Sequence, residues 1–165
     1  MNLLELQKID FLLKKANNHS HNVNPHQIVF SLNGKFYTGD FIPFIDENLN
    51  VLLPDVTSFD KDSKKGIGLK NENEWKQIGK YINGDIDSRD FNKLVSLSSH
   101  SDKSYYLQLV IEMYKKYPIE FEETLPSYIY NVKTFSSDPS IEFPIIHVDQ
   151  NINFDFISLI PKNNS

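Results

Sequence analysis

The chain has 165 residues, a formal net charge of −5 and no cysteine. A sequence without cysteine excludes disulfides, thiolate catalysis and cysteine-ligated metal centres, and the length fits one globular domain spanning residues 1–165. No apolar stretch reaches the roughly 18 residues of a membrane span, and acidic residues interrupt the first apolar stretch where a signal peptide would continue. We therefore expect a cytoplasmic protein that makes no contact with membranes.

The acidic excess lies in the last third of the sequence. Residues 1–117 carry fifteen acidic and fifteen basic side chains, whereas residues 118–165 carry seven acidic and two basic ones. This distribution argues against nucleic acid as the partner of the last third and favours a basic protein partner. Arg89 is the only arginine in the sequence, which further weakens a nucleic-acid interpretation because guanidinium groups are the preferred ligands of phosphates and guanine.

The chain opens with a predicted helix. Apolar residues recur at helical spacing and form one face with two neighbours that widen it: Leu6, Ile9, Phe11, Leu12, Leu13 and Ala16. Lys14 and Lys15 lie in the last turn, where the helix dipole favours cations. We expect this helix to pack on the rest of the domain.

A β-hairpin follows. Asn33-Gly34 separates two runs of β-forming residues and favours a type I′ turn, in which both central residues need a positive φ. In that register Phe30 faces Tyr37, and Val29 faces Thr38. Residues 50–53 predict a third strand that completes a meander and ends at Pro54. Pro43 suggests that the second strand bends or lies at a sheet edge.

The middle of the chain predicts a loop and two short helices. Residues 55–71 are polar, contain two glycines and predict a mobile loop. Residues 72–82 predict a helix with Trp75, Ile78 and Ile82 inward. Residues 88–97 predict a second helix with three inward side chains, namely Phe91, Leu94 and Val95. Asp87 and Asp90 resemble a capping box built with the shorter acid.

Residues 102–117 predict the central core helix. Two apolar rows leave only a narrow polar stripe, so most of the circumference should be buried. Ser101 or Asp102 can cap its start, and Pro118 stops it. The last fifty residues then predict strands over 127–135, 141–149 and 153–161. The fold class is α+β, with an antiparallel sheet made of the N-terminal meander and the C-terminal strands, packed against the central helix and two to three further helices.

The histidines are the first candidates for chemistry. His19, His21 and His26 share one loop, but no carboxylate lies within it, so a solvated loop explains them better than a metal site. His147 and Asp149 share a face of a predicted strand and could form an oriented general base, but a polar outer strand face is enough to explain them and is the favoured interpretation. We expect no metal site and no catalytic residue.

No motif predicts a cofactor. The acidic runs that begin at Asp60 and Asp85 fail the EF-hand pattern at its later positions, and no phosphate-binding or dinucleotide-binding glycine motif occurs. The lysine-rich region around Trp75 interleaves acids, which favours a solvated surface over a nucleic-acid patch.

An interface is the remaining candidate. Tyr128 and Tyr130 fall on one predicted strand face near an acidic run, and aromatic anchors rimmed by charge are typical of protein interfaces. The simpler alternative is that these tyrosines cap the core with their hydroxyls in water. The predicted partner-binding residues are Glu120, Glu122, Glu123, Tyr128, Tyr130, Asp138, Glu142 and Asp155.

Together these features favour a non-catalytic protein-binding protein. Its most concrete form is an immunity protein that neutralises a bacterial toxin, with the acidic residues steering a basic toxin domain and the tyrosines supplying buried contact. Two alternatives stay open. One is a small hydrolase with a site around His147, and the other is a self-assembling structural or adaptor protein.

Overall fold

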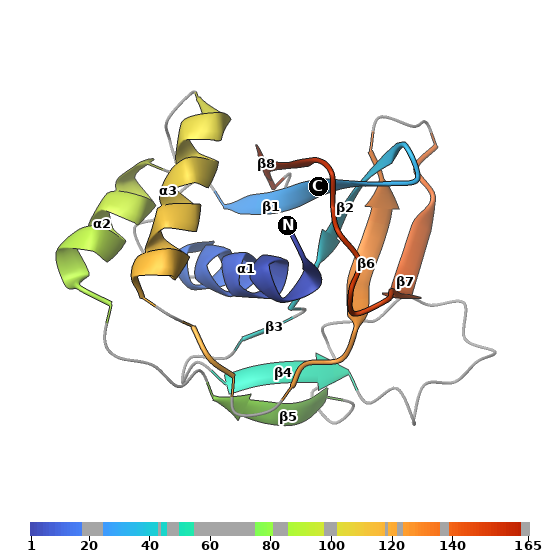
Figure 1. The fold of residues 1–165 in the computed structure, drawn as a ribbon, viewed down its shortest axis with the longest axis horizontal. Coiled ribbons are helices and arrows are strands. Elements are labelled where there is room, and N and C mark those ends of the chain that lie inside the picture. Colours follow the sequence, from blue (N-terminus) through green and yellow to red (C-terminus); the bar gives the residue numbers. More distant parts are fainter. Residues whose placement is uncertain are drawn as a thin grey trace.

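The computed structural model describes residues 1–17, 25–42, 44–45, 50–54, 75–80, 86–97, 102–117, 119–121, 124–135 and 139–162. Its elements are, in chain order, α1 (Leu3–Asn17), β1 (His26–Leu32), β2 (Lys35–Asp40), β3 (Phe44–Ile45), β4 (Asn50–Pro54), β5 (Trp75–Lys80), α2 (Ser88–Leu97), α3 (Lys103–Lys116), β6 (Tyr128–Thr134), β7 (Glu142–His147) and β8 (Ile157–Pro161). Five strands form one antiparallel sheet in the order β7-β6-β2-β1-β8, and β3, β4 and β5 form a second (Figure 1). The α+β class is confirmed.

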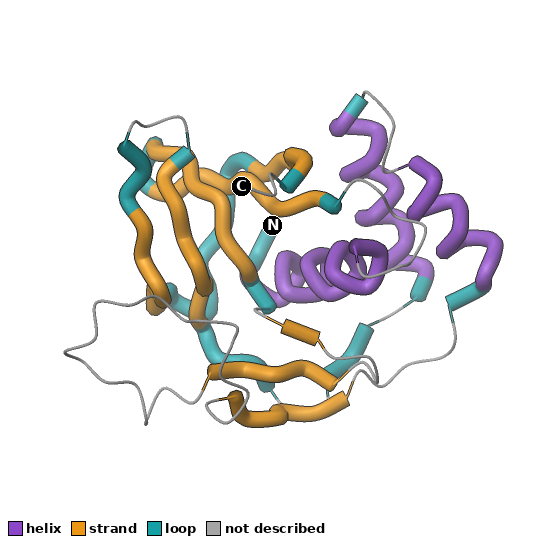
Figure 2. The backbone as a smooth tube through the Cα atoms, turned by 180° about the vertical axis from the view of Figure 1, so that it is seen from behind, coloured by secondary structure: helices purple, strands orange, loops and turns teal. Residues whose placement is uncertain are grey.

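The helix at the centre of the fold is α1, rather than the expected helix 102–117. Figures 1 and 2 show α1 between the five-stranded sheet on one side and α2 and α3 on the other, with the small sheet beneath it. α1 buries nine side chains, including the polar Gln7 and Asp10. α3 buries Tyr106, Val110, Met113 and Tyr114, while Leu107 and Ile111 of its second apolar row stay partly exposed. Both helices carry enough apolar residues to be buried on most sides. Which of them lies at the centre depends on tertiary packing.

The β1–β2 hairpin has the predicted turn and register. Asn33 and Gly34 both have positive φ, 51° and 76°. Phe30 pairs with Tyr37 and Val29 with Thr38, as expected. β2 is nevertheless the middle strand and not an edge, because β6 pairs with its far side. Residue 43 lies outside the described residues, so the bend expected at that proline stays a prediction.

The third strand of the predicted meander belongs to the other sheet. β4 pairs with β3 and β5, because the edge of β2 that it would have used is hydrogen-bonded to β6. The helix predicted for residues 72–82 is wrong, since residues 75–80 form β5, which pairs with β4 from Pro54↔Trp75 to Asn50↔Lys80. Trp75 and Ile78 are three residues apart, which fits one turn of a helix. The backbone hydrogen bonds of this segment are nevertheless made with β4, a strand distant in sequence. The predicted loop 55–71 lies outside the described residues.

The predicted α2 and α3 are present, with caps that match their sequences. Asp102 Oδ1 accepts from the backbone N–H of Ser104 at 3.0 Å, and Asp87 Oδ1 accepts from that of Arg89 at 2.8 Å. Asp90, the second half of the expected capping box, instead accepts from Lys116 Nζ at 2.7 Å and thereby ties α2 to α3. Leu94 and Val95 are buried as predicted, and Phe91 packs partly buried against the core.

A buried ionic cluster fixes α1 to the end of β2. Asp10, only 3% exposed, accepts hydrogen bonds from the backbone N–H groups of Phe41 (2.7 Å) and Ile42 (2.9 Å). Lys14 Nζ bridges Asp10 at 2.9 Å and Asp40 at 3.0 Å. Burial raises the pKa of Asp10 against the opposing attraction of Lys14. Burial also opposes the charge on Lys14, but the two carboxylates outweigh it and raise the pKa of that amine.

Candidate functional site

The histidines divide between core and surface. His19 and His21 lie outside the described residues. His26 does not lie in a solvated loop, as the sequence suggested, but begins β1 and is 2% exposed, with its ring centroid 4.8 Å from that of Tyr106 on α3. α3 packs over the end of the sheet where β1 begins, which explains the burial. Within the described part of the chain, no group of three or more metal-ligating side chains gathers.

His147 and Asp149 are near the end of β7 but are held differently. The ring of His147 stacks edge-on against Tyr128 with 5.4 Å between centroids. Asp149 lies beyond the strand in a turn, where its Oδ1 accepts from the backbone N–H of Asn151 at 2.8 Å. The Asp149 carboxylate is therefore engaged in its own turn, and the hydrolase hypothesis gains no geometric support from this pair.

The two tyrosines of the predicted interface share a strand face but differ in exposure. Their rings make an edge-on contact at 6.2 Å between centroids. Tyr130 is 2% exposed and belongs to the core, where burial raises the pKa of its hydroxyl, whereas Tyr128 is half-buried. A partner at this face would reach Tyr128 but not Tyr130 in this conformation. The Tyr130 hydroxyl is therefore not in water, so the interpretation that these tyrosines cap the core with wet hydroxyls can describe Tyr128 but not Tyr130.

The predicted acidic residues do not form one surface in the part of the chain that can be described. Glu120 is exposed in the segment after α3, Glu142 starts the edge strand β7, and Asp155 precedes β8. Glu142 forms an exposed ion pair with Lys133 at 3.3 Å, at the opposite end of the β6–β7 pair from Tyr128. Glu122, Glu123 and Asp138 lie outside the described residues.

A cluster of exposed phenylalanines lies at the hairpin end of the five-stranded sheet. Phe36 is 44% exposed and contacts Phe156, 45% exposed, edge-on at 5.2 Å between ring centroids. Phe135, 40% exposed, donates its backbone N–H to the carbonyl of Phe36 at 2.8 Å. Because residues opposite each other on neighbouring strands share a face, Phe135 and Phe36 point the same way. We call Phe36, Phe135 and Phe156 the phenylalanine face.

The phenylalanine face is assembled from β2, the residue that follows β6 and the segment before β8, at the end of the sheet away from the helices (Figure 1). Ile141, just before the edge strand β7, and Phe143, near the start of β7, are also exposed at the same end. The sequence carried one signal for this cluster. Phe36-Tyr37 and Phe156-Ile157 are adjacent apolar pairs, and since side chains of a strand alternate, one member of each pair had to leave the core face.

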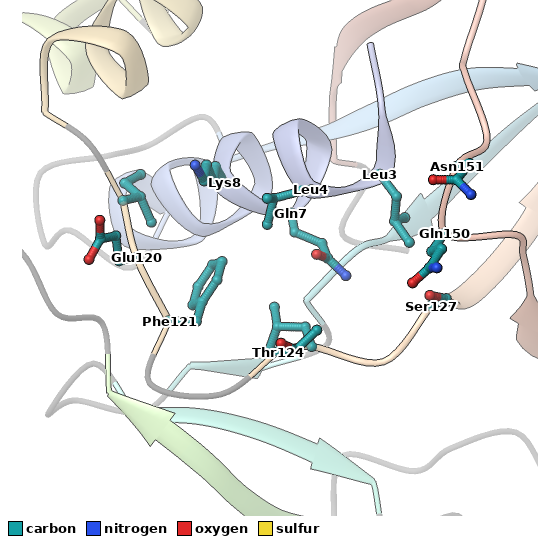
Figure 3. A pocket seen from close by; sticks show the side chains of 12 residues that line it. Leu3, Leu4, Gln7, Lys8, Glu120, Phe121, Thr124, Ser127, Gln150 and Asn151 are labelled. Carbon is teal, nitrogen blue, oxygen red and sulfur yellow. The ribbon is translucent and has the colours of Figure 1, made fainter.

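A groove of about 640 Å³ runs along α1 (Figure 3). One wall is a face of α1, and the other is formed by residues 119–121 and 124–127, with the turn at 150–151 closing one end. The lining residues are Leu3, Leu4, Gln7, Lys8, Ile119, Glu120, Phe121, Thr124, Leu125, Ser127, Gln150 and Asn151. Of the predicted interface residues, Glu120 lies here. Sequence reasoning missed the groove because its three parts are distant along the chain.

The comparisons with known proteins are negative. No protein-family model, curated protein or solved structure matches this chain. Among the described helices, none combines the length and apolar character needed to cross a membrane.

Proposed function

We propose that this chain is a non-catalytic protein that binds another protein through the phenylalanine face. The observation that supports this most directly is the gathering of three phenylalanines, each 40–45% exposed, from three separate segments. An aromatic side chain has about 150–250 Å² to bury, so the three leave roughly 200–300 Å² of apolar surface in water. That area suits the apolar centre of an interface, with the polar surroundings supplying the rest of about 800 Å² per partner.

The charges around the phenylalanine face are balanced at close range. Asp155 and Glu142 are negative, Lys35 and Lys133 are positive, and Lys133 is bonded to Glu142. The contact itself should therefore depend mainly on apolar burial and weakly on salt. Long-range attraction comes instead from the acidic excess of residues 118–165, seven acidic against two basic side chains, and it favours a basic partner.

The most concrete form of this function is an immunity protein that neutralises a basic bacterial toxin. In that mechanism the acidic residues of the last third, including Glu120, Glu142 and Asp155, raise the rate of encounter. The phenylalanine face then holds the complex. Tyr128 contributes only where a partner extends along β6. Charge reversal of Glu122 and Glu123 together should slow association and flatten its dependence on salt, because these residues add to the steering charge.

The test is a pull-down of the tagged full chain from its native cells, with bound proteins identified by mass spectrometry. Wild type is compared with the double variant Phe36→Ser/Phe156→Ser and with Tyr105→Ser on α3, whose side chain is 46% exposed. We expect one stoichiometric partner with wild type and Tyr105→Ser, and at least about tenfold less with the double variant. Circular dichroism must show that all three proteins are folded.

A partner retained equally by the double variant would refute the phenylalanine face as its binding site. Recovery of wild type without any partner would refute the function itself, and a mass that rises with concentration in light scattering would favour self-assembly instead. If a partner is found, its toxicity when expressed alone, and the relief of that toxicity by co-expression of this chain, decide whether the protein is an immunity protein.

A further inference from the structure

The groove along α1 has the volume of a ligand-binding site, and its walls are held in position by hydrogen bonds. Its volume of about 640 Å³ lies within the usual range for ligand sites, roughly 300–1,000 Å³. Its walls are held in place, since Gln7 Nε2 on α1 donates to the carbonyl of Pro126 on the opposite wall at 3.2 Å. At the far end, the backbone N–H of Phe154 donates to the carbonyl of Met1 at 2.8 Å. A ligand would thus meet walls that are already positioned.

The floor of the groove is apolar. Leu3, Ile119 and Leu125 are buried beneath it, and the half-buried Phe121 stands on one wall. Leu4 is 50% exposed although it belongs to the most buried helix of the fold, and it points into the groove (Figure 3). An apolar side chain of a ligand laid along this floor would remove Leu4 from water.

The polar groups above the floor are mostly neutral amides and hydroxyls. Thr124 and Ser127 come from the wall opposite α1, and Gln150 and Asn151 come from the closing turn, whereas the buried Gln7 amide already donates to Pro126. A side-chain amide offers two N–H donors and a carbonyl acceptor, which are the groups that pair with a peptide backbone. The lining therefore combines apolar contact with groups that can hydrogen-bond a peptide backbone.

The charges of the groove exclude a polyanionic ligand and suit a peptide. Lys8 is its one lining cation, so a nucleotide or another phosphate ester would lack counter-charge. The start of α1 offers no anion site either, because Asn2 and Glu5 cap it reciprocally at 2.9 Å in each direction. Lys8 on α1 and Glu120 on the opposite wall lie at the same end of the groove (Figure 3). Within the described residues neither takes part in an ion pair. They complement a charged side chain or terminus of a peptide.

We propose that this groove binds a short peptide in an extended conformation. Its apolar side chain packs on Leu4 and Phe121, its backbone pairs with Gln150 and Asn151, and a charged end lies between Lys8 and Glu120. The site is separate from the phenylalanine face and does not rest on the function proposed for that face.

The test starts from the immobilised full chain and a displayed library of random linear peptides. The enriched peptides are synthesised, and their affinities are measured by fluorescence anisotropy. Thr124→Arg places a bulky side chain in the groove from an exposed position, and Leu4→Ser removes the exposed apolar contact. We expect each variant to weaken binding by at least about tenfold. The control Phe156→Ser, on the phenylalanine face, should leave the affinity within about twofold.

Side-chain amide signals in NMR spectra supply the second measurement. Addition of peptide should shift the side-chain amide resonances of Gln150 and Asn151 in wild type, and a folded Thr124→Arg variant should lose those shifts. Enriched peptides that bind Thr124→Arg as tightly as wild type, or that lose affinity with Phe156→Ser instead, would overturn the proposal. A library that yields no peptide above background would overturn it as well.

Discussion

Replacing Asp10 with alanine should destabilise the protein more than any exposed ion pair can. The Asp10 carboxylate is 3% exposed, accepts two backbone hydrogen bonds at 2.7 and 2.9 Å, and binds Lys14 at 2.9 Å. Each hydrogen bond to a charged group contributes about 1.5–3 kcal/mol, and breaking a buried pair from one side costs about 3–5 kcal/mol. Part of this is offset because burial already disfavours the charged carboxylate. We expect a loss of about 3–5 kcal/mol for Asp10→Ala.

The assay is urea unfolding followed by far-UV circular dichroism, with the slope m compared between proteins. The matched control is Glu142→Ala, which removes one partner of the exposed Lys133–Glu142 pair at 3.3 Å. That change should cost less than about 1 kcal/mol. Hydrogen exchange adds a local readout, because the amides of Phe41 and Ile42 lose their acceptor in Asp10→Ala and should exchange faster. A loss below about 1 kcal/mol, or unchanged exchange at these two amides, would refute the anchoring role of Asp10.

Three further predictions concern the core and its charges. The pKa of Lys14 is raised in the folded protein, so the stability that this charge contributes should be complete below the ordinary lysine pKa of 10.5 and lost as the pH rises through the folded-state pKa. The difference in unfolding free energy between wild type and Lys14→Met should therefore narrow in that alkaline range. A difference that stays constant with pH would contradict this. The Tyr106 hydroxyl is buried with no hydrogen-bond partner among the described residues, and burial raises its pKa to about 12. Tyr106→Phe should therefore leave the free energy of unfolding in urea unchanged or increase it by about 1 kcal/mol. A clear loss of stability would mean that the hydroxyl has a partner. A Cβ at Gly39 would meet Ile129 Cγ2 at 3.0 Å and the carbonyl oxygen of Tyr130 at 3.3 Å. Gly39→Ala should therefore lower the free energy of unfolding by about 1–3 kcal/mol, measured by thermal unfolding. A neutral effect would mean that β6 can move aside.

The elements that the sequence predicted correctly are those whose signals are local. Asn33-Gly34 dictated a turn with two positive φ values, and the turn in turn fixed the pairing of Phe30 with Tyr37. Asp102 capped α3 through groups two and three residues away. In each case the interacting groups are neighbours along the chain, so no knowledge of the fold was needed.

The errors arose where the partner was distant in sequence. Residues 75–80 became β5 because β4 offered them a ladder of backbone hydrogen bonds, and β4 was itself free because β6 had taken the edge of β2. With so few apolar residues, the spacing expected for a helix can hardly be distinguished from that expected for a strand. The pairing with β4 therefore determined that this segment is a strand. α1 and α3 both carry broad apolar faces, so the sequence did not distinguish which of them is the central helix. Contacts with segments distant in sequence placed α1 there.

The surfaces proposed to bind ligands depended on tertiary structure even more. The amino-acid sequence by itself determined the α+β class, the three C-terminal strands, the acidic excess of the last third and the surplus of aromatic residues. It did not determine that Phe36 and Phe156, 120 positions apart, meet on one face, or that Tyr130 is enclosed while Phe135 remains in water. Alternation along a strand divides side chains between two faces, but which face is covered depends on what packs against it. That packing is a property of the whole chain, and it determined which aromatic residues became core and which became surface.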